Sequence, residues 1–186
     1  MCQQWLGDSR LFEGLARVDA ELAEQAREQG CACGGRLHRA RYRRKPRGGP
    51  ANPDGGDVFR DSFCCEREGC RKRKTPPSVR FLGRRVYLGA VVVLATAGQS
   101  GLSRRHVAAL RERLGVCERT LRRWCAWWRD TFPRTPFWRT ARARFVPPVD
   151  LAALPDSLIE RFSGDDPSER VTRVLRFLAP LSAGGF

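Results

Sequence analysis

The chain has 186 residues, which is enough for one ordinary domain or two to three small modules, and too few for a large catalytic core with separate binding modules. Hydrophobic residues make up 41% of it and charged residues 30%, so the composition excludes a mainly disordered chain. The formal net charge of +15 favours a polyanionic partner, because clustered cations gain affinity by releasing counterions from phosphates.

The excess positive charge lies in the middle of the chain. Residues 31–83 hold fourteen basic and five acidic side chains, and residues 84–147 hold fourteen and three, whereas both ends are weakly acidic. Of the 35 cations 32 are arginine, which suits bidentate contacts to phosphate and guanine but also fits the bias of a GC-rich genome. A polybasic membrane-surface protein is the competing interpretation, and we favour nucleic acid.

Two features of the sequence indicate the compartment. No secretory leader is visible, and the longest nearly apolar stretch, residues 86–97, is too short to cross a bilayer. We therefore expect a cytoplasmic protein without membrane contact. Eight cysteines in a reducing compartment favour metal ligands or buried thiols over disulfides.

Residues 1–30 form the first predicted segment, an amphipathic helix of about five turns over residues 9–29. Gly30 stands where a helix-ending glycine belongs. Such an apolar stripe forms either the seam of a homodimer or the contact of the helix with its own domain, and we favour the second. The stripe consists of Leu11, Leu15, Val18 and Leu22.

Residues 31–83 form the second segment, in which two short cysteine clusters flank a basic, glycine-rich and proline-rich stretch. Short strands and turns fit this composition better than helices. Four soft ligands from two turns suit a structural, tetrahedral Zn²⁺ that pins a hairpin with little core of its own. The preferred ligands are Cys31, Cys33, Cys65 and Cys70. Cys64 is an alternative to Cys65, His38 is an alternative to one thiolate, and cysteines without metal are the competing interpretation.

Residues 84–147 form the third segment, which predicts a helical DNA-binding domain. A buried helix is expected over residues 84–97, with a strand as the alternative because of the run Val91-Val92-Val93. Two further helices are expected over residues 103–114 and 117–131, joined by a turn that contains glycine. The run RTARARF after Pro133 and Pro136 is expected to be a basic extension. The two helices around the turn have the layout of a helix-turn-helix.

The second of these helices has distinct inner and outer faces. Its inner face is expected to comprise Leu121, Trp124, Cys125 and Trp128. Advancing 100° per residue from Leu121 places Arg119 and Arg123 on the opposite face, where they would reach guanine edges in a major groove. Phosphate contacts are expected for Arg122, Arg104 and Arg105, and for Arg71 and Arg73 in the RKRK run.

Residues 148–186 form the last segment and predict two short helices, over 155–162 and 167–178. The second has a clear start, because Asp166 can cap the free amides and Pro167 suits the first helical position. Its apolar face is expected to comprise Val171, Val174, Leu175 and Leu178. The expected fold is therefore α+β, a zinc ribbon of short antiparallel strands followed by a helix-turn-helix domain, with helical extensions at both ends.

The cysteine knuckles, the run GCRKRKT, an intervening helix and the motif LGVCERTLRRW together resemble small zinc-ribbon, helix-turn-helix proteins encoded by bacterial insertion sequences. The similarity covers residues 31–131. It implies sequence-specific binding of double-stranded DNA at the ends of the element, as an accessory or DNA-binding subunit beside a separately encoded transposase. It also implies a bacterial, nucleoid-associated protein, with zinc at the four preferred cysteines and DNA contact around Arg119, Thr120, Arg122 and Arg123.

We expect no enzymatic activity. The acidic residues Asp54, Asp57 and Asp61 lie in or beside a glycine-proline loop, and the pair Asp165-Asp166 precedes a helix as a cap would. Neither group is placed on strands around a pocket, as a magnesium site of a nuclease would be. The alternatives to transposon-end binding are a zinc-ribbon RNA- or protein-interaction module and a transcriptional regulator unrelated to transposition.

Overall fold

The computed structural model describes residues 8–44, 58–81, 89–97 and 104–183. Over these ranges the chain is α+β, with several helices and two small antiparallel sheets, which confirms the expected class. The helices are α1 (Ser9–Glu28), α2 (Gly89–Thr96), α3 (Arg104–Leu114), α4 (Glu118–Ala126), α5 (Pro136–Ala141), α6 (Asp156–Ile159) and α7 (Pro167–Leu178). The strands are β1 (Leu37–Arg39), β2 (Tyr42–Arg44), β3 (Val58–Arg60), β4 (Phe63–Cys65) and β5 (Arg73–Lys74).

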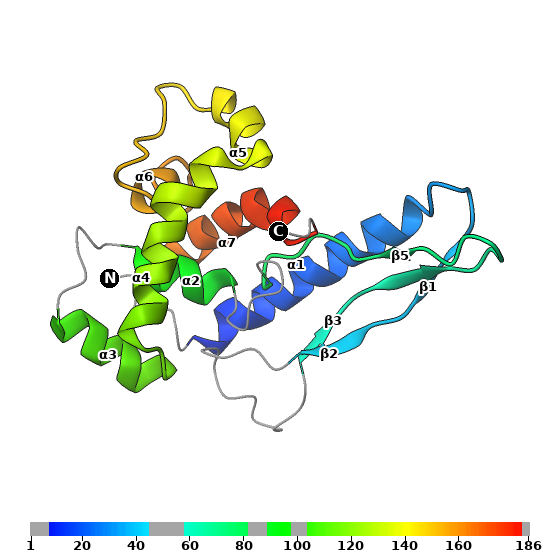
Figure 1. The fold of residues 1–186 in the computed structure, drawn as a ribbon, viewed down its shortest axis with the longest axis horizontal. Helices are drawn as coiled ribbons and strands as arrows, with labels where there is room; N and C mark the ends of the chain where they lie inside the picture. Colours follow the sequence, from blue (N-terminus) through cyan, green and yellow to red (C-terminus); the bar gives the residue numbers. More distant parts are fainter. Residues whose placement is uncertain (1–7, 45–57, 82–88, 98–103, 184–186) are drawn as a thin grey trace.

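The predicted N-terminal helix is α1, which links the two parts of the molecule. The Asp8 side chain caps it by accepting a hydrogen bond of 2.9 Å from the Arg10 amide, and Gly30 follows its end with φ of +67°. The first half of its apolar face is buried in a large core among the helices. Ala23 and Ala26, in its second half, belong to a smaller core beneath the strands. Figure 1 shows α1 running from the helices on the left to the strands on the right.

The strands form a slender projection that we call the arm, comprising residues 31–44 and 58–74. In the three-stranded sheet the order is β1-β4-β5, with Leu37 opposite Cys65 and Cys64 opposite Arg73. Strands β2 and β3 form a separate two-stranded ribbon. Since side chains alternate along a strand, Leu37 and Cys65 point toward α1 and are buried.

The helices α2 to α7 form a second body that we call the helical lobe. Helix α2 packs against α4 and α7 and is buried on every side chain that the structure describes. The Trp128 indole N–H donates a 3.0 Å hydrogen bond to the Thr96 hydroxyl, which ties α2 to the end of α4. Residues 82–88, which include the start of the predicted helix 84–97, lie outside the described residues, as does the expected cap Ser103. No helix among the described residues is long and apolar enough to cross a membrane.

The predicted helix over residues 117–131 is interrupted. An α-helix continues to Ala126, and the residues Trp127–Thr131 then form one π turn. A π turn holds an additional residue, so two successive side chains reach the inner face, and both Trp127 and Trp128 are buried. Cys125 is also expected on the buried inner face, but its side chain is only partly buried.

The run RTARARF is not an extension, which corrects that expectation. It lies in α5 and a 3₁₀ turn, Arg142–Arg144, and the Thr135 hydroxyl caps the start of α5 by accepting from the Trp138 amide. Trp138 is buried and stacks between Phe132 and Phe145, with ring centroids 4.9 and 5.8 Å away. These ring contacts hold the segment against the helical lobe, while its arginine side chains remain exposed.

The C-terminal helices close the lobe. Helix α7 has its predicted bounds, its Asp166 cap and its buried apolar face, whereas α6 covers only Asp156–Ile159 of the expected 155–162. The large core draws side chains from α1, α2, α3, α4 and α7. Val79 and Phe81 of the second predicted segment also belong to this core, so all four predicted segments contribute to it.

A buried polar network joins α1, the segment that follows β5 and the C-terminal end of the lobe. The Asp19 carboxylate accepts hydrogen bonds from the Ser78 hydroxyl, the Val79 amide and the Arg80 guanidinium, at 2.7, 2.7 and 2.8 Å. The Ser78 amide in turn donates to the Ser182 hydroxyl at 2.7 Å. Sequence patterns gave no indication of this network, since Asp19 looks like any acidic residue of an amphipathic helix.

Candidate metal centre and candidate nucleic-acid interface

Four cysteine sulfur atoms meet at the end of the arm. They belong to Cys31, Cys33, Cys65 and Cys70, and all lie within 4.8 Å of one another. The Sγ atoms of Cys33 and Cys65 are 3.5 Å apart and those of Cys31 and Cys70 are 3.7 Å apart. Ligands about 2.3 Å from a tetrahedral ion stand roughly 3.8 Å from each other, whereas a disulfide requires about 2.05 Å. The predicted association of these four residues is confirmed, and its spacing fits a metal site.

A tight loop after α1 supplies the first two sulfurs. The Gly34 amide donates to the Cys31 carbonyl at 2.8 Å, and the Cys31 amide donates to the Gly35 carbonyl at 3.1 Å. Gly34 has φ of +80°, a conformation that favours glycine. A Cβ atom on Gly35 would lie 2.7 Å from the Cys65 sulfur, so the two loops approach this closely only because residue 35 has no side chain. No local pattern in the sequence indicates this role of Gly35.

A second turn, after β4, supplies the other two sulfurs. The Cys70 amide donates to the Arg67 carbonyl at 3.1 Å, and Gly69 has φ of +83°. Arg71 also has positive φ, at 42°, so the chain reverses sharply around Cys70. This reversal accommodates the four residues between Cys65 and Cys70, which are two more than in a usual knuckle.

The structure separates the two alternative ligands from the cluster. Cys64 is on the opposite face of β4 from Cys65, and its Sγ lies 3.7 Å from the Arg71 carbonyl oxygen. The His38 ring lies 3.1 Å from the Glu66 carboxylate and is mostly exposed. The four preferred cysteines are thus the set that the fold brings together.

Backbone amides and the neighbouring thiols separate the pKa values of Cys33 and Cys65. The Gly35 backbone amide and the neighbouring thiols of Cys70 and Cys65 lower the pKa of Cys33 to about 6. A backbone amide at Arg67 acts to lower the pKa of Cys65, but burial and the adjacent thiols raise it to about 12. Thiolates this close repel each other, and a divalent cation removes that repulsion by replacing the protons.

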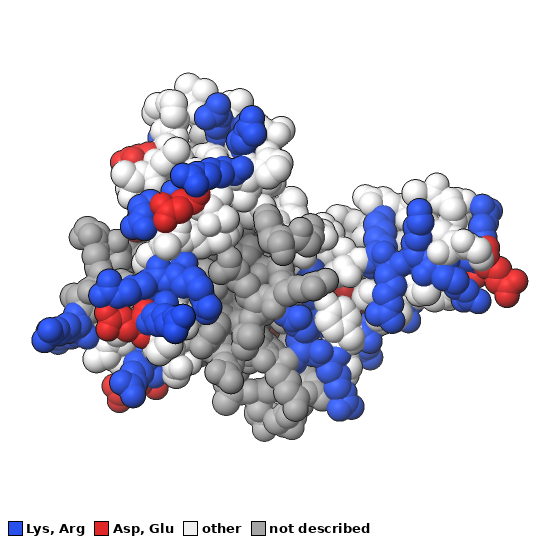
Figure 2. Space-filling view, in the orientation of Figure 1, with Lys and Arg blue, Asp and Glu red and all other residues white. Residues whose placement is uncertain are grey.

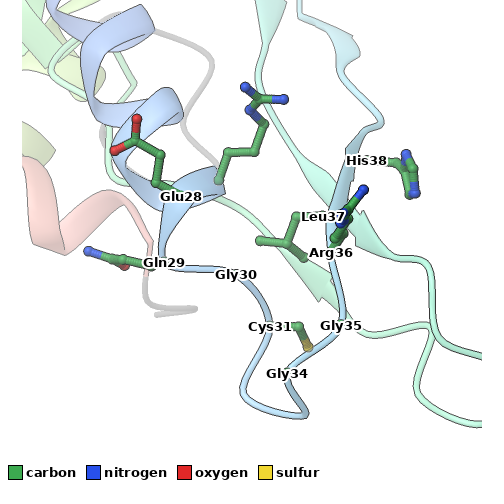
Figure 3. Close-up of a pocket in the computed structure, with 10 residues that line it drawn as sticks. Glu28, Gln29, Gly30, Cys31, Gly34, Gly35, Arg36, Leu37 and His38 are labelled. Carbon is green, nitrogen blue, oxygen red and sulfur yellow. The ribbon is translucent and has the colours of Figure 1, made fainter.

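A groove beside the cluster leaves the site accessible from solvent. It has a volume of about 550 Å³ and runs between the last turn of α1 and the start of β1, with Cys31 in its wall (Figure 3). Arg27, Arg36 and His38 also line it. Such an opening provides the entry path that a metal ion needs.

Helices α3 and α4 carry the other predicted site. They pack against each other across a turn in which Gly115 has φ of +61° and Val116 is fully buried. Leu121 and Trp124 are buried as expected, and Arg119 and Arg123 are exposed on the opposite face of α4. Thr120 is partly buried, with its hydroxyl 3.4 Å from the Cys117 sulfur.

The other predicted DNA contacts differ in their partners. Arg122 is exposed but forms an ion pair of 2.6 Å with Glu118, one turn earlier in α4. Arg104 and Arg105 are exposed on α3, and Arg71 and Arg73 are exposed on the arm. Figure 2 shows Lys and Arg side chains gathered over α3 and α4 and again over the arm, both visible from the same side of the molecule.

Two of the acidic catalytic candidates form structural contacts in the described part of the chain. Asp61 lies 3.6 Å from the Arg39 guanidinium, and Asp166 caps α7. Asp54 and Asp57 lie outside the described residues.

Neither a protein-family model, nor a curated protein, nor a solved structure matches this chain. Any functional assignment therefore depends on the geometry and charge of the sites themselves.

Proposed function

We propose that the protein binds double-stranded DNA in a sequence-specific manner, with α4 in the major groove. The observation that carries this proposal is the position of Arg119 and Arg123, exposed on α4 directly opposite its buried Leu121 and Trp124. A helix that is anchored by one face and presents arginines on the other has the form that reads guanine edges.

An ion pair within α4 supports different roles for its arginines in DNA binding. Arg122 is held by Glu118, so part of its charge is already neutralised. For Arg119 and Arg123, the structure gives no ion pair within the described residues. Bidentate contact with a base requires a guanidinium that is free to turn, and these two side chains meet that condition.

The arm supplies a second basic surface in this proposal. Its described residues include eleven basic and three acidic side chains, and Arg71 and Arg73 are exposed near the metal centre. We assign these two to phosphate contacts, which add affinity without reading sequence. The resemblance to proteins of insertion sequences suggests an accessory or DNA-binding subunit at element ends, working with a separately encoded transposase. A transcriptional regulator would use the same surface.

The DNA proposal is tested by selecting the preferred duplex from a random library and measuring affinity at two salt concentrations. Arg119→Ala or Arg123→Ala should cost roughly 1–3 kcal/mol on the preferred duplex and reduce discrimination between duplexes. Arg71→Ala should weaken all duplexes similarly and lower the salt dependence by about one counterion.

Arg139→Ala is the matched control, because it removes one exposed charge from α5 without touching α4. If Arg119→Ala and Arg123→Ala behave like Arg139→Ala in folded protein, α4 is not the reading helix. Selection of RNA in place of a duplex would favour an RNA-binding module.

For the metal centre we propose structural Zn²⁺, since four thiolates at tetrahedral spacing form a site that this ion fills in many small ribbons. The purified protein should hold about one zinc per chain, and chelation should unfold the arm. Cys70→Ser should abolish stoichiometric zinc, whereas Cys64→Ser should retain it because Cys64 faces away from the cluster. Elemental analysis of both variants checks this, and another metal, or none, in folded wild-type protein would contradict it.

A further inference from the structure

An exposed aromatic side chain stands on the two-stranded ribbon of the arm. Phe59, in β3, is 38% exposed, and among the described residues only Val146 and Leu151 are other large apolar side chains with such exposure. Phe59 contributes to neither core, whereas its neighbour Val58 packs against the large one. Its ring therefore lies outside both cores and is partly open to solvent.

Two arginines lie beside this ring. The Arg41 guanidinium carbon lies 4.9 Å from the ring centroid, and Arg43 is the cross-strand partner of Phe59. Among the described residues, the acidic residue nearest to Phe59 in sequence is Asp61, which is paired with Arg39. Positive charge at this density would not attract an apolar protein surface, but it attracts the phosphates of a nucleic-acid strand.

We propose that Phe59 and Arg41 form a stacking platform for an unpaired base of single-stranded nucleic acid. The exposed part of the ring supplies π surface for the base, and Arg41 both orients the ring and attracts the adjoining phosphate. Recognition of this kind tolerates any base, because every base has a π face. The platform is separate from α4, so it adds a second activity to the proposed reading of duplex DNA.

The test uses the full-length, metal-loaded chain and a fluorescein-labelled dT₁₂ strand, with binding followed by anisotropy. Phe59→Ala should weaken binding by about 5-fold to 100-fold. Leu151→Ala is the matched control, because Leu151 is 42% exposed but lies in the helical lobe, and it should leave affinity unchanged. Equal affinities of the wild type, Phe59→Ala and Leu151→Ala would overturn the proposal, and so would absence of dT₁₂ binding by the wild type.

Two further variants separate stacking from a general loss of structure. Phe59→Tyr should retain the affinity, whereas Phe59→Leu should lose it although it keeps an apolar side chain and an unchanged melting temperature. Equal affinity of the Tyr and Leu variants would overturn stacking.

Two variants distinguish binding of a single strand by Phe59 from binding of duplex DNA by α4. Arg119→Ala should leave dT₁₂ affinity intact, and Phe59→Ala should leave discrimination between duplexes intact. Loss of dT₁₂ binding in Arg119→Ala would place the single strand on α4 and overturn the platform.

Discussion

At Gly35 an added methyl group would lie 2.7 Å from the Cys65 sulfur and 3.4 Å from the Cys33 sulfur. Gly35→Ala should therefore push the two loops of the metal centre apart, lowering metal affinity and destabilising the fold by roughly 1–3 kcal/mol, as overpacking does. Competitive chelator titration together with urea unfolding measures both effects.

Gly14→Ala provides the comparison for that variant. A Cβ atom there meets nothing within 4 Å, and alanine suits the interior of α1, so stability should rise by about 0.5–1 kcal/mol with metal affinity unchanged. A Gly35→Ala protein that binds metal as tightly as Gly14→Ala would show that the two loops can separate without loss of the site.

At the scale of single residues, the sequence could predict which side chains face outward but not which loops meet. Arg119 and Arg123 lie where a rotation of 100° per residue places them, because α4 is regular as far as Ala126. The choice of Cys65 over Cys64 depends on which face of β4 packs against α1, and that is set by Leu37 and Ala26 from other elements. The contact of Gly35 with sulfur depends on the approach of two distant loops.

At the scale of elements, the C-terminal end of α1 is held by a lysine from β5. The Lys74 ammonium group donates to the carbonyl oxygens of Ala26 and Gly30, at 3.1 and 3.3 Å, and to the Gln29 side chain. A cation at this position donates hydrogen bonds to the free carbonyl groups and interacts favourably with the negative end of the helix dipole. Lys74→Met should therefore cost about 1–2 kcal/mol in urea unfolding.

Lys72→Met tests whether that loss is specific. Lys72 is an exposed neighbour of the same charge. Its replacement should change stability by less than about 0.5 kcal/mol. Equal losses in the two variants would mean that the contact of Lys74 with α1 contributes little.

Element boundaries were predictable where local signals are strong and not where distant packing decides. The cap at Asp166 and the proline after it fix the start of α7 from the sequence alone. The π turn at Trp127–Thr131 has no such local signal. It allows both tryptophans to enter the aromatic cluster with Phe132, and that requirement comes from the packing of the lobe.

At the scale of the whole molecule, the Asp19 network joins parts of the chain that are far apart in sequence. Asp19→Ala removes the acceptor of three buried or partly buried donors and leaves the Arg80 guanidinium without its ion-pair partner. The loss should be about 3–5 kcal/mol, the range for breaking a buried charge pair. It should lower a single cooperative melting transition, because the network connects α1 to both the 76–81 segment and the lobe.

Glu21→Ala is the matched control, two residues further along α1. Glu21 pairs with Arg176 of α7 at 2.6 Å, but both side chains are about half exposed, so the loss should be below about 1 kcal/mol. A melting curve for Asp19→Ala that matches Glu21→Ala would show that the network does not hold the parts together.

The division of α1 between two cores has a consequence for synthesis on the ribosome. The small core and the four clustered sulfurs all lie between residues 23 and 70, so this part of the arm can form while later segments are still being made. The large core needs side chains as far along as Leu181. The apolar stripe at the start of α1 is therefore translated well before the side chains that cover it, and until then it is an exposed surface that a chaperone could shield on the nascent chain.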